Sequence, residues 1–236
     1  MIRKSSILLV AVLLTSSLAL QAKESLQPYL APQALELAVF LPPPPTVGSA
    51  EDREDLAAVL QVQRQRTPQE VERAKRDDHL SDAVFPFAGE IFGPRFTLDR
   101  HPHTAHFFRR TLKDLVQTLM PAKAHFARPR PYEASKEVQP ILPPPMGESY
   151  PSGHTMDAYL TAILLARMVP EKRDPLFARA AAAAQSRVVA GVHYPTDLEG
   201  GRISAVALAA ELLHNPAALD DFNRARREVR ATLALD

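Results

Sequence analysis

No stretch of this chain shows the sustained alternation of apolar and polar residues that a half-buried β-strand requires, and this feature restricts its possible folds most. Alanine, leucine, glutamate and arginine are abundant, and only 8 of the 236 residues are glycine. This composition favours helices. The 22 prolines then separate one helical segment from the next. We therefore expect an all-α protein.

The length and charge of the chain limit its organisation and its partners. With 236 residues, of which 46% are hydrophobic, it can bury one sizeable core without needing two. Its formal net charge is +1, from 28 basic and 27 acidic residues, so nothing draws the whole surface toward nucleic acid or anionic membranes. We expect a single-domain helical bundle that acts on small molecules and does not bind nucleic acid. Assembly into a homo-oligomer stays open.

The first 22 residues have the pattern of a secretory signal peptide. Arg3 and Lys4 provide a positive start, residues 7–14 are apolar, and Ala19 and Ala22 supply small side chains. We predict cleavage after Ala22 and a periplasmic or secreted location. An uncleaved membrane anchor is the alternative, but the apolar run is shorter than the roughly 20 residues of a spanning helix. No stable membrane insertion is expected after cleavage.

Residues 23–50 form a proline-rich segment that contains "FLPPPPTVGS". Consecutive prolines adopt an extended backbone, so we expect an arm that lies across the remaining helical domain, residues 51–236. A binding site for a proline-recognising partner is the alternative interpretation of this arm.

Capping residues and prolines predict where the helices begin and end. Thr67, Pro68 and Glu70 combine an N-cap, a first-turn proline and a capping-box acid, which predicts a helix from Pro68 to about Ala83. Apolar residues from Phe107 onward fall on one face of a helix that we expect to end at Pro121. The other predicted helices cover residues 51–66 after the cap Ser49, 155–169, 174–190, 197–213, and a last one capped by Asn215.

Three segments hold most of the residues that can bind an anion or transfer a proton. They are "KAHFARPRP" with Lys123, Arg128 and Arg130, "SYPSGH" with Ser152, Gly153 and His154, and "SRVVAGVHYPTD" with Ser186, Arg187, His193 and Asp197. Guanidinium groups, an ammonium, a hydroxyl and a glycine amide at a helix N-terminus together suit a phosphate group. We predict phosphate binding by Lys123, Arg130, Ser152, Gly153 and Arg187. Solvent exposure of Arg128 and simple packing of Ser186 stay open.

Two histidines and an aspartate in these segments supply the parts of a phosphoryl transfer. Asp197 follows His193 by four residues, so its carboxylate can accept a hydrogen bond from one ring nitrogen and leave the other free to attack phosphorus. His154 is then the general acid that protonates the leaving oxygen. We predict hydrolysis of phosphate monoesters through a phosphohistidine, with activity that is bell-shaped in pH.

The three segments also resemble the signature of the type-2 phosphatidic acid phosphatase and vanadium haloperoxidase superfamily. Lys123 is followed after six residues by Arg130-Pro131, then comes Pro151-Ser152-Gly153-His154, and Ser186-Arg187 leads to His193 and Asp197 at the matching spacings. With the secretory signal and the modest length, the chain most resembles bacterial class A non-specific acid phosphatases. That resemblance implies an all-helical exported enzyme and the same roles for these residues.

Other uses of the chain stay open as alternatives. His101, His103, His106 and His125 could form a zinc site, but the chain has no cysteine and no His-Glu-x-x-His motif, and we expect no metal and no cofactor. Within the same fold, the alternatives are a lipid phosphate phosphatase and a vanadate-dependent haloperoxidase. A non-catalytic binding module is the alternative of a different class.

Overall fold

A computed structural model describes residues 26–80, 84–145 and 147–235, and every regular element within them is a helix, which confirms the predicted all-α class. The predicted signal peptide, residues 1–22, lies outside these described residues. In chain order, the elements are α1 (Leu37–Phe40), α2 (Ala50–Gln65), α3 (Pro68–Asp78), α4 (Ala88–Phe92), η2 (Leu98–Arg100), α5 (Pro102–Phe126), α6 (Pro131–Ala134), α7 (Gly153–Met168), η3 (Pro170–Lys172), α8 (Arg173–Val189), α9 (Pro195–His214) and α10 (Pro216–Thr232).

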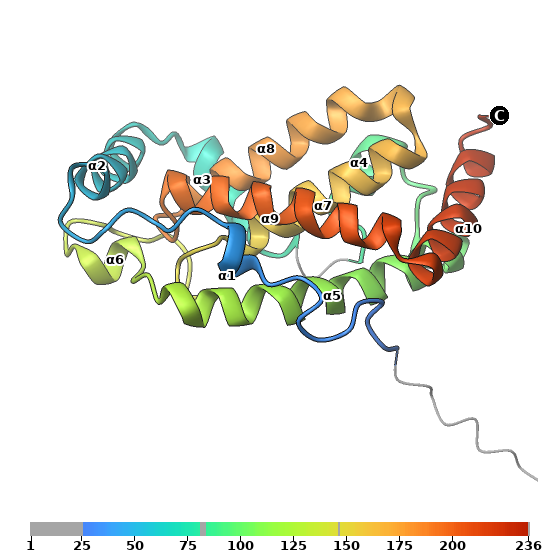
Figure 1. The fold of residues 1–236 in the computed structure, drawn as a ribbon. Helices are drawn as coiled ribbons and strands as arrows, with labels where there is room; N and C mark the ends of the chain where they lie inside the picture. Colours follow the sequence, from blue (N-terminus) through green and yellow to red (C-terminus); the bar gives the residue numbers. More distant parts are fainter. Residues whose placement is uncertain (1–25, 81–83, 146, 236) are drawn as a thin grey trace, which may run out of the picture.

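The helices are arranged around α7. This helix packs against both α8 and α9, and α5 lies against α10 (Figure 1). The long α5 runs along one side of the molecule, α10 closes one end, and α2 and α6 lie at the opposite end. The ends of α5, α7, α8 and α9 that carry the predicted site residues therefore face the end occupied by α2 and α6.

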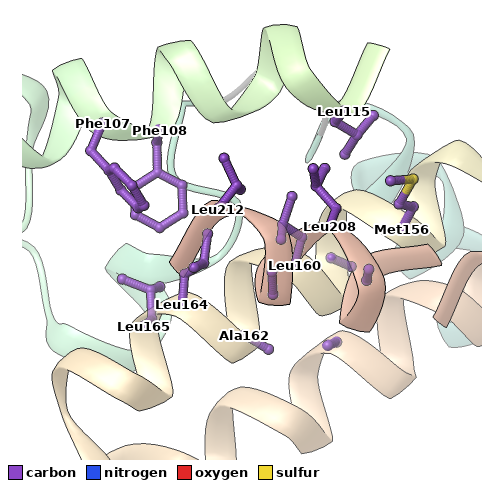
Figure 2. Close-up of a cluster of buried hydrophobic side chains, with 14 of the residues drawn as sticks. Phe107, Phe108, Leu115, Met156, Leu160, Ala162, Leu164, Leu165, Leu208 and Leu212 are labelled. Atoms are coloured by element: carbon purple, nitrogen blue, oxygen red, sulfur yellow. The ribbon is translucent and has the colours of Figure 1, made fainter. Parts of the chain in front are cut away.

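The central core is formed by apolar side chains of α5, α7 and α9 (Figure 2). Its members include Phe107, Phe108 and Leu115 from α5, Met156, Leu160, Leu164 and Leu165 from α7, and Leu208 and Leu212 from α9. The α7 residues in this set are at most 2% exposed, so α7 is apolar on more than one side. A helix with this pattern belongs in the middle of a bundle, and that is its position here.

Local capping signals gave correct helix starts. Thr67 caps α3, its side chain and that of Glu70 exchange hydrogen bonds with each other's backbone, and Pro68 is the first helical residue. Ser49 accepts from the amide of Asp52 at the start of α2, and Asn215 accepts from two amides at the start of α10. The predicted capping groups are confirmed at all three helices.

The predicted end of α5 at Pro121 is wrong, because the helix continues through this proline to Phe126. Proline removes one backbone donor from a helix, but packing beyond it compensates here. Ala122 is buried in the core, and the Lys123 ammonium donates to the carbonyl of Glu148. The helix ends only at Ala127, whose backbone is left-handed with φ +47°.

The predicted end of α3 near Ala83 is also wrong, because the helix ends at Asp78. The two last residues of α3 are both held by α8: Asp77 contacts Arg179 and Ser186, and Asp78 contacts Arg187. These tertiary contacts fix the end of the helix, and no local signal announces them. The predicted boundaries of α2, α7, α8 and α9 lie within about two residues of the observed ones.

The described part of the arm, residues 26–50, lies along the helical domain. The backbone amides of Tyr29 and Leu30 donate to the buried carboxylate of Asp114 on α5, at 2.9 and 2.8 Å. Farther along, the Tyr150 hydroxyl donates to the carbonyl of Pro42 at 2.6 Å. The arm is thus attached both to α5 and to the loop that precedes α7. Among the helices described, none has the length and apolar character needed to cross a bilayer.

Candidate active site

The eight residues predicted to bind phosphate or to react lie together at helix ends. Lys123 is in the last turn of α5, Arg130 directly precedes α6, Ser152, Gly153 and His154 open α7, Arg187 is in the last turn of α8, and His193 and Asp197 flank the start of α9. The amide of Ser152 donates to the carbonyl of Asp197 at 3.0 Å, which joins the start of α7 to the start of α9. Gly191, with φ +73°, makes the turn between Arg187 and His193.

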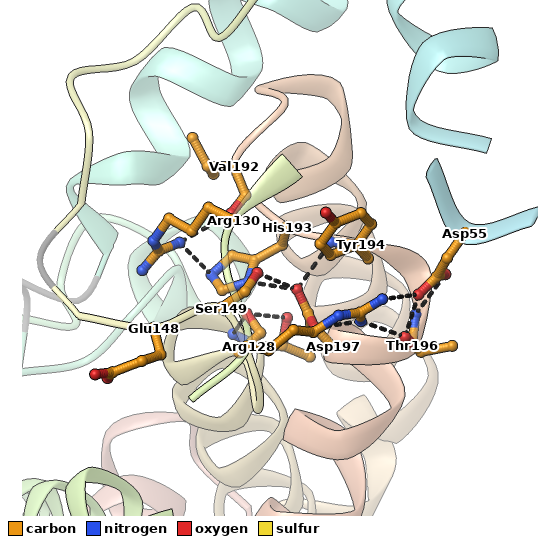
Figure 3. A network of polar contacts seen from close by, with 12 residues as sticks. Asp55, Arg128, Arg130, Glu148, Ser149, Val192, His193, Tyr194, Thr196 and Asp197 are labelled. Carbon is orange, nitrogen blue, oxygen red and sulfur yellow. Dashed lines mark hydrogen bonds and ion pairs between the residues drawn. The ribbon is translucent and has the colours of Figure 1, made fainter. Parts of the chain in front are cut away.

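His193 and Asp197 form a buried hydrogen-bonded pair (Figure 3). The distance from His193 Nδ1 to Asp197 Oδ2 is 3.1 Å, and both side chains are almost completely buried. Burial lowers the pKa of His193 well below its ordinary value of 6.5. With Nδ1–H donating to the carboxylate, the neutral ring keeps a lone pair on Nε2. That nitrogen lies 3.2 Å from the Arg130 guanidinium, at the edge of the cationic cluster.

Asp197 is itself held by several donors. Its Oδ2 accepts from the Ser149 hydroxyl and from the Tyr194 amide, and its Oδ1 accepts from Arg128 at 2.8 Å. Burial alone would raise the pKa of Asp197, but the hydrogen bond from His193, the charge of Arg128 and the hydrogen bond from Ser149 hold it below its ordinary value. The carboxylate therefore stays ionised, and His193 has a fixed orientation.

Arg128 connects this pair to α2. Its guanidinium donates to Asp197 and to Asp55, each at 2.8 Å, and it stacks over the ring of Tyr194 (Figure 3). Asp55 also accepts from the Thr196 hydroxyl. Arg128 is 4% exposed, so the alternative of a solvent-facing side chain is wrong. Because two carboxylates bind it, we regard Arg128 as a residue that positions Asp197.

Two buried cations, Lys123 and Arg130, lie near the Nε2 edge of His193. Lys123 donates to the carbonyls of Glu148 and Ser149, and Arg130 donates to the carbonyls of Gly147 and Val192. Burial, and then the charge of Arg130, lowers the pKa of Lys123 to about 8. Buried cations that repel one another form a site with a strong preference for an anion.

Arg187 has a buried guanidinium edge that is suited to binding an anion. It is 1% exposed, and its NH1 donates to the Asp78 carboxylate at 2.6 Å. Its Nε and NH2 are buried and have no hydrogen-bond partner among the described residues. These two nitrogens form the parallel donor pair that binds carboxylate or phosphate oxygens in a bidentate manner. A buried guanidinium edge without an acceptor is costly unless a ligand supplies one.

Ser152, Gly153 and His154 occupy the first turn of α7. The Ser152 hydroxyl accepts from the Thr155 amide and so caps the helix, while its own proton remains available to a ligand. A side chain at Gly153 would lie 2.8 Å from a methyl group of Leu119, so glycine lets α7 approach α5 closely. Amides at a helix N-terminus point toward bound anions.

His154 has a different environment from His193. Its Nε2 lies 3.2 Å from the carbonyl oxygen of Asp78 and 3.8 Å from the carboxylate of the same residue. Burial, and then the charge of Arg187, lowers the pKa of His154 to about 4, although Asp78 opposes this change. A bound phosphate would offset the positive charge and raise the pKa again.

Sequence reasoning missed three residues of the site, namely Ser149, Asp55 and Asp78. Ser149 is the first residue of the "SYPSGH" segment, but a lone serine gives no signal of its bond to Asp197. Asp55 and Asp78 lie on α2 and α3, far from the signature along the chain. Only tertiary contacts place them at the site. Ser186 was left open, and it donates to Asp77 at 2.6 Å.

The histidine-rich segment forms separate contacts. Both ring nitrogens of His101 are engaged, by the Thr97 carbonyl and the Thr232 hydroxyl, and its ring stacks on Phe96. His106 faces Asp221, and His125 packs against Phe126. The described residues contain no group of three or more histidine, cysteine, aspartate or glutamate side chains that could hold a metal ion.

Comparison with known proteins relates these residues to named families. Residues 107–219, which include the whole signature, match the model of the PAP2 superfamily. The chain is 29% identical to a non-specific acid phosphatase of Providencia stuartii over 202 residues, which cover 83% of this chain and 82% of that protein. It is 28% identical to an acid phosphatase of Zymomonas mobilis, covering 81% and 74% of the two chains. A non-specific acid phosphatase of Salmonella typhi is 26% identical, covering 87% and 85%.

Solved structures support the fold. A bacterial vanadium-dependent iodoperoxidase superposes with a TM-score of 0.54 at 18% identity, over 73% of this chain and 52% of that one. A transmembrane PAP2 type phosphatidylglycerolphosphate phosphatase from Bacillus subtilis superposes with a TM-score of 0.53 at 21% identity, over 74% and 88% of the chains. The helical arrangement is that of the PAP2 and haloperoxidase fold, as predicted.

Proposed function

We propose that this chain, which carries a PAP2 superfamily domain, is an acid phosphatase that hydrolyses organic phosphate monoesters through a phosphohistidine on His193. The observation that supports this best is the position of the His193 Nε2 beside Arg130, with the opposite ring nitrogen bound to Asp197. A neutral, oriented imidazole next to buried cations has the properties of a nucleophile for phosphorus.

The first step transfers the phosphoryl group to the enzyme. The Nε2 lone pair of His193 attacks phosphorus, the bond to the ester oxygen breaks, and His154 donates its proton to the departing oxygen. The products of this step are an alcohol and a phosphohistidine. Asp197 stabilises the positive charge that the His193 ring acquires, and Arg128 and Ser149 hold Asp197 in place.

The second step releases phosphate. Neutral His154 takes a proton from a water molecule, the water oxygen attacks phosphorus, and the phosphorus–nitrogen bond of His193 breaks. Inorganic phosphate leaves, and both histidines return to their starting protonation states. Throughout, the phosphoryl oxygens bind to Lys123, Arg130, Ser152, the Gly153 amide and Arg187. Arg187 is the strongest candidate, because its Nε and NH2 find no acceptor within residues 26–80, 84–145 and 147–235.

These side chains already provide a nucleophile, an acid and the cations for the transition state, so the proposed reaction uses no metal. We also propose that the enzyme is exported to the periplasm or secreted. This rests on the residues of the predicted signal peptide.

The decisive experiment is hydrolysis of p-nitrophenyl phosphate by the purified protein from pH 4 to 9, with and without EDTA and orthovanadate. We expect mildly acidic activity that survives EDTA and is inhibited by vanadate. His193→Ala should abolish both turnover and the acid-quenched phosphoenzyme. Loss of activity in EDTA would contradict the metal-free mechanism. An inactive wild-type protein would favour a haloperoxidase or a binding module, which bromide, peroxide and vanadate together would distinguish.

A further inference from the structure

We infer that Asp78, at the end of α3, is a positioning residue that couples the general acid His154 to the phosphate ligand Arg187. This inference rests on the proposed function and assigns a role to a residue outside the signature segments. Its carboxylate donates no proton in the reaction. It holds the Arg187 guanidinium in one orientation and provides negative charge that favours the protonated form of His154.

The position of Asp78 is set by its neighbour. Asp77 is 2% exposed and accepts from Arg179 at 2.7 Å and from the Ser186 hydroxyl at 2.6 Å. Both partners lie on α8, the helix that carries Arg187. Asp77 therefore fixes the end of α3 against α8, and Asp78 is delivered to Arg187 at 2.6 Å.

The contact between Asp78 and Arg187 uses only one edge of the guanidinium. Asp78 accepts from NH1, whereas Nε and NH2 are buried and have no hydrogen-bond partner in the part of the chain that the structure describes. A carboxylate on NH1 therefore leaves the parallel donor pair free and fixes the direction in which it points. Asp78 does not take the place of phosphate on this edge, and it limits the rotation of the group that binds phosphate.

The same residue faces His154 with two negative groups. The carbonyl of Asp78, in the last turn of α3, lies 3.2 Å from His154 Nε2, and its carboxylate lies 3.8 Å away. A helix C-terminus carries partial negative charge and favours a nearby cation. Arg187 from α8 and Arg130 before α6 are described residues whose charges act on His154, and both oppose its protonation. Among the described residues, the charge and carbonyl of Asp78 counteract them.

The test compares Asp78→Asn with the charge-matched control Asp174→Asn. The Asp174 carboxylate is 88% exposed and pairs with its neighbour Arg173. Because the acid matters most for a poor leaving group, kcat for phenyl phosphate should fall about ten-fold in Asp78→Asn, and kcat for p-nitrophenyl phosphate much less. The alkaline limb of kcat should move down by roughly one pH unit. Inhibition by inorganic phosphate should weaken several-fold, and the control should behave as wild type.

Two results would overturn the inference. One is an equal loss of kcat for both substrates with an unmoved alkaline limb, which a purely structural role for Asp78 would produce. The other is tighter phosphate inhibition, which would mean that Asp78 competes with phosphate for Arg187. Melting temperatures of both variants, and of Asp78→Glu, establish that the compared proteins are folded.

A measurement without turnover separates this inference from the proposed function. NMR titration of the His154 ring in the presence of inorganic phosphate should give a lower pKa in Asp78→Asn than in the wild type, whether or not the protein hydrolyses esters. If the wild type hydrolyses esters but the pKa of the His154 ring is the same in Asp78→Asn, the proposed function would stand and the role of Asp78 would be overturned. If the wild type is inactive but Asp78→Asn still lowers the pKa of the His154 ring, the proposed function would be wrong and the effect of Asp78 on His154 would stand.

Discussion

At the residue scale, the two histidines of the site differ in what surrounds them. His193 is fully buried and donates to Asp197, whereas His154 is partly exposed and faces Asp78 and Arg187. Burial favours the neutral form of both rings, which suits a nucleophile but not an acid. His154 therefore depends on its substrate, because a phosphate dianion beside Arg187 restores the negative charge that a protonated ring requires.

This dependence predicts different pH limits for free enzyme and complex. Because the acid must be protonated, activity is lost as pH rises through the pKa of His154, which is about 4 without ligand. The alkaline limb of kcat, which reports the complex, should therefore lie roughly one to two pH units above that of kcat/KM, which reports the free enzyme. Initial rates with p-nitrophenyl phosphate from pH 3.5 to 8 measure both. Coinciding limbs would contradict the prediction, and His154→Asn should lack the limb in kcat.

A second prediction at this scale concerns Arg128. Lysine keeps the charge but cannot bridge Asp55 and Asp197 with a planar fork, so Arg128→Lys should loosen Asp197 and lower kcat about ten-fold or more. The loss should be equal for phenyl and p-nitrophenyl phosphate, since the nucleophile and not the acid is affected. Steady-state kinetics with both esters test this. Arg224 forms an exposed ion pair with Asp220, so Arg224→Lys is the matched control, and its kcat should equal that of the wild type.

At the element scale, the site depends on how closely α9 approaches the start of α7. A side chain at Gly201 would place its first carbon 2.5 Å from the carbonyl oxygen of Ser152, and one at Gly200 would lie 2.6 Å from the Tyr150 ring. Both neighbours belong to the segment that caps α7. Two glycines of α9 thus permit the helix contact that sets the distance between the phosphate ligands and Asp197.

Gly201→Ala should therefore disturb both stability and activity. The new methyl group meets backbone, which cannot rotate away, so we expect a loss of about 2 kcal/mol in the free energy of unfolding. A fall in kcat/KM should accompany it, because Ser152 has to move. Urea unfolding and steady-state kinetics measure the two effects. Gly89→Ala in α4, where an added carbon meets nothing within 4 Å, should show neither, and a neutral Gly201→Ala would refute the close contact.

At the scale of the whole molecule, burial of the site makes its stability sensitive to acid. The unfolded chain takes up protons on histidine near pH 6.5, but folded His154 does so only near 4, and folded His193 also resists protonation. A histidine whose folded pKa is depressed contributes stability above the unfolded pKa, and that stability is lost as pH falls toward the folded pKa. Folding and phosphate binding are therefore linked through the same side chains.

The predicted loss is measurable by unfolding at different pH values. Between pH 7 and 4, His154 alone should remove about 3 kcal/mol from the free energy of unfolding. Saturating inorganic phosphate should recover part of it. Urea titrations at pH 7, 5.5 and 4 provide the data. The pH dependence should be shallower in His154→Gln and unchanged in His214→Gln, which replaces an exposed histidine. Equal slopes in all three proteins would contradict the linkage.

The sequence by itself determined the helical class, most helix starts and the residues of the signature. These features depend on neighbours along the chain: Thr67 and Asn215 cap the helices that follow them, and His193 reaches Asp197 because four residues separate them. Spacing of this kind can be recognised without coordinates. The match to the PAP2 superfamily model, over residues 107–219, covers the signature.

Only the tertiary structure decided how far some helices run and which residues support the site. Pro121 does not end α5, because core packing of Ala122 and the contacts of Lys123 outweigh one lost hydrogen bond. Likewise, α3 ends at Asp78 because α8 holds its last two residues. The physical reason is that such contacts join residues 25 to 109 positions apart, and their energies leave no periodic or local mark on the sequence.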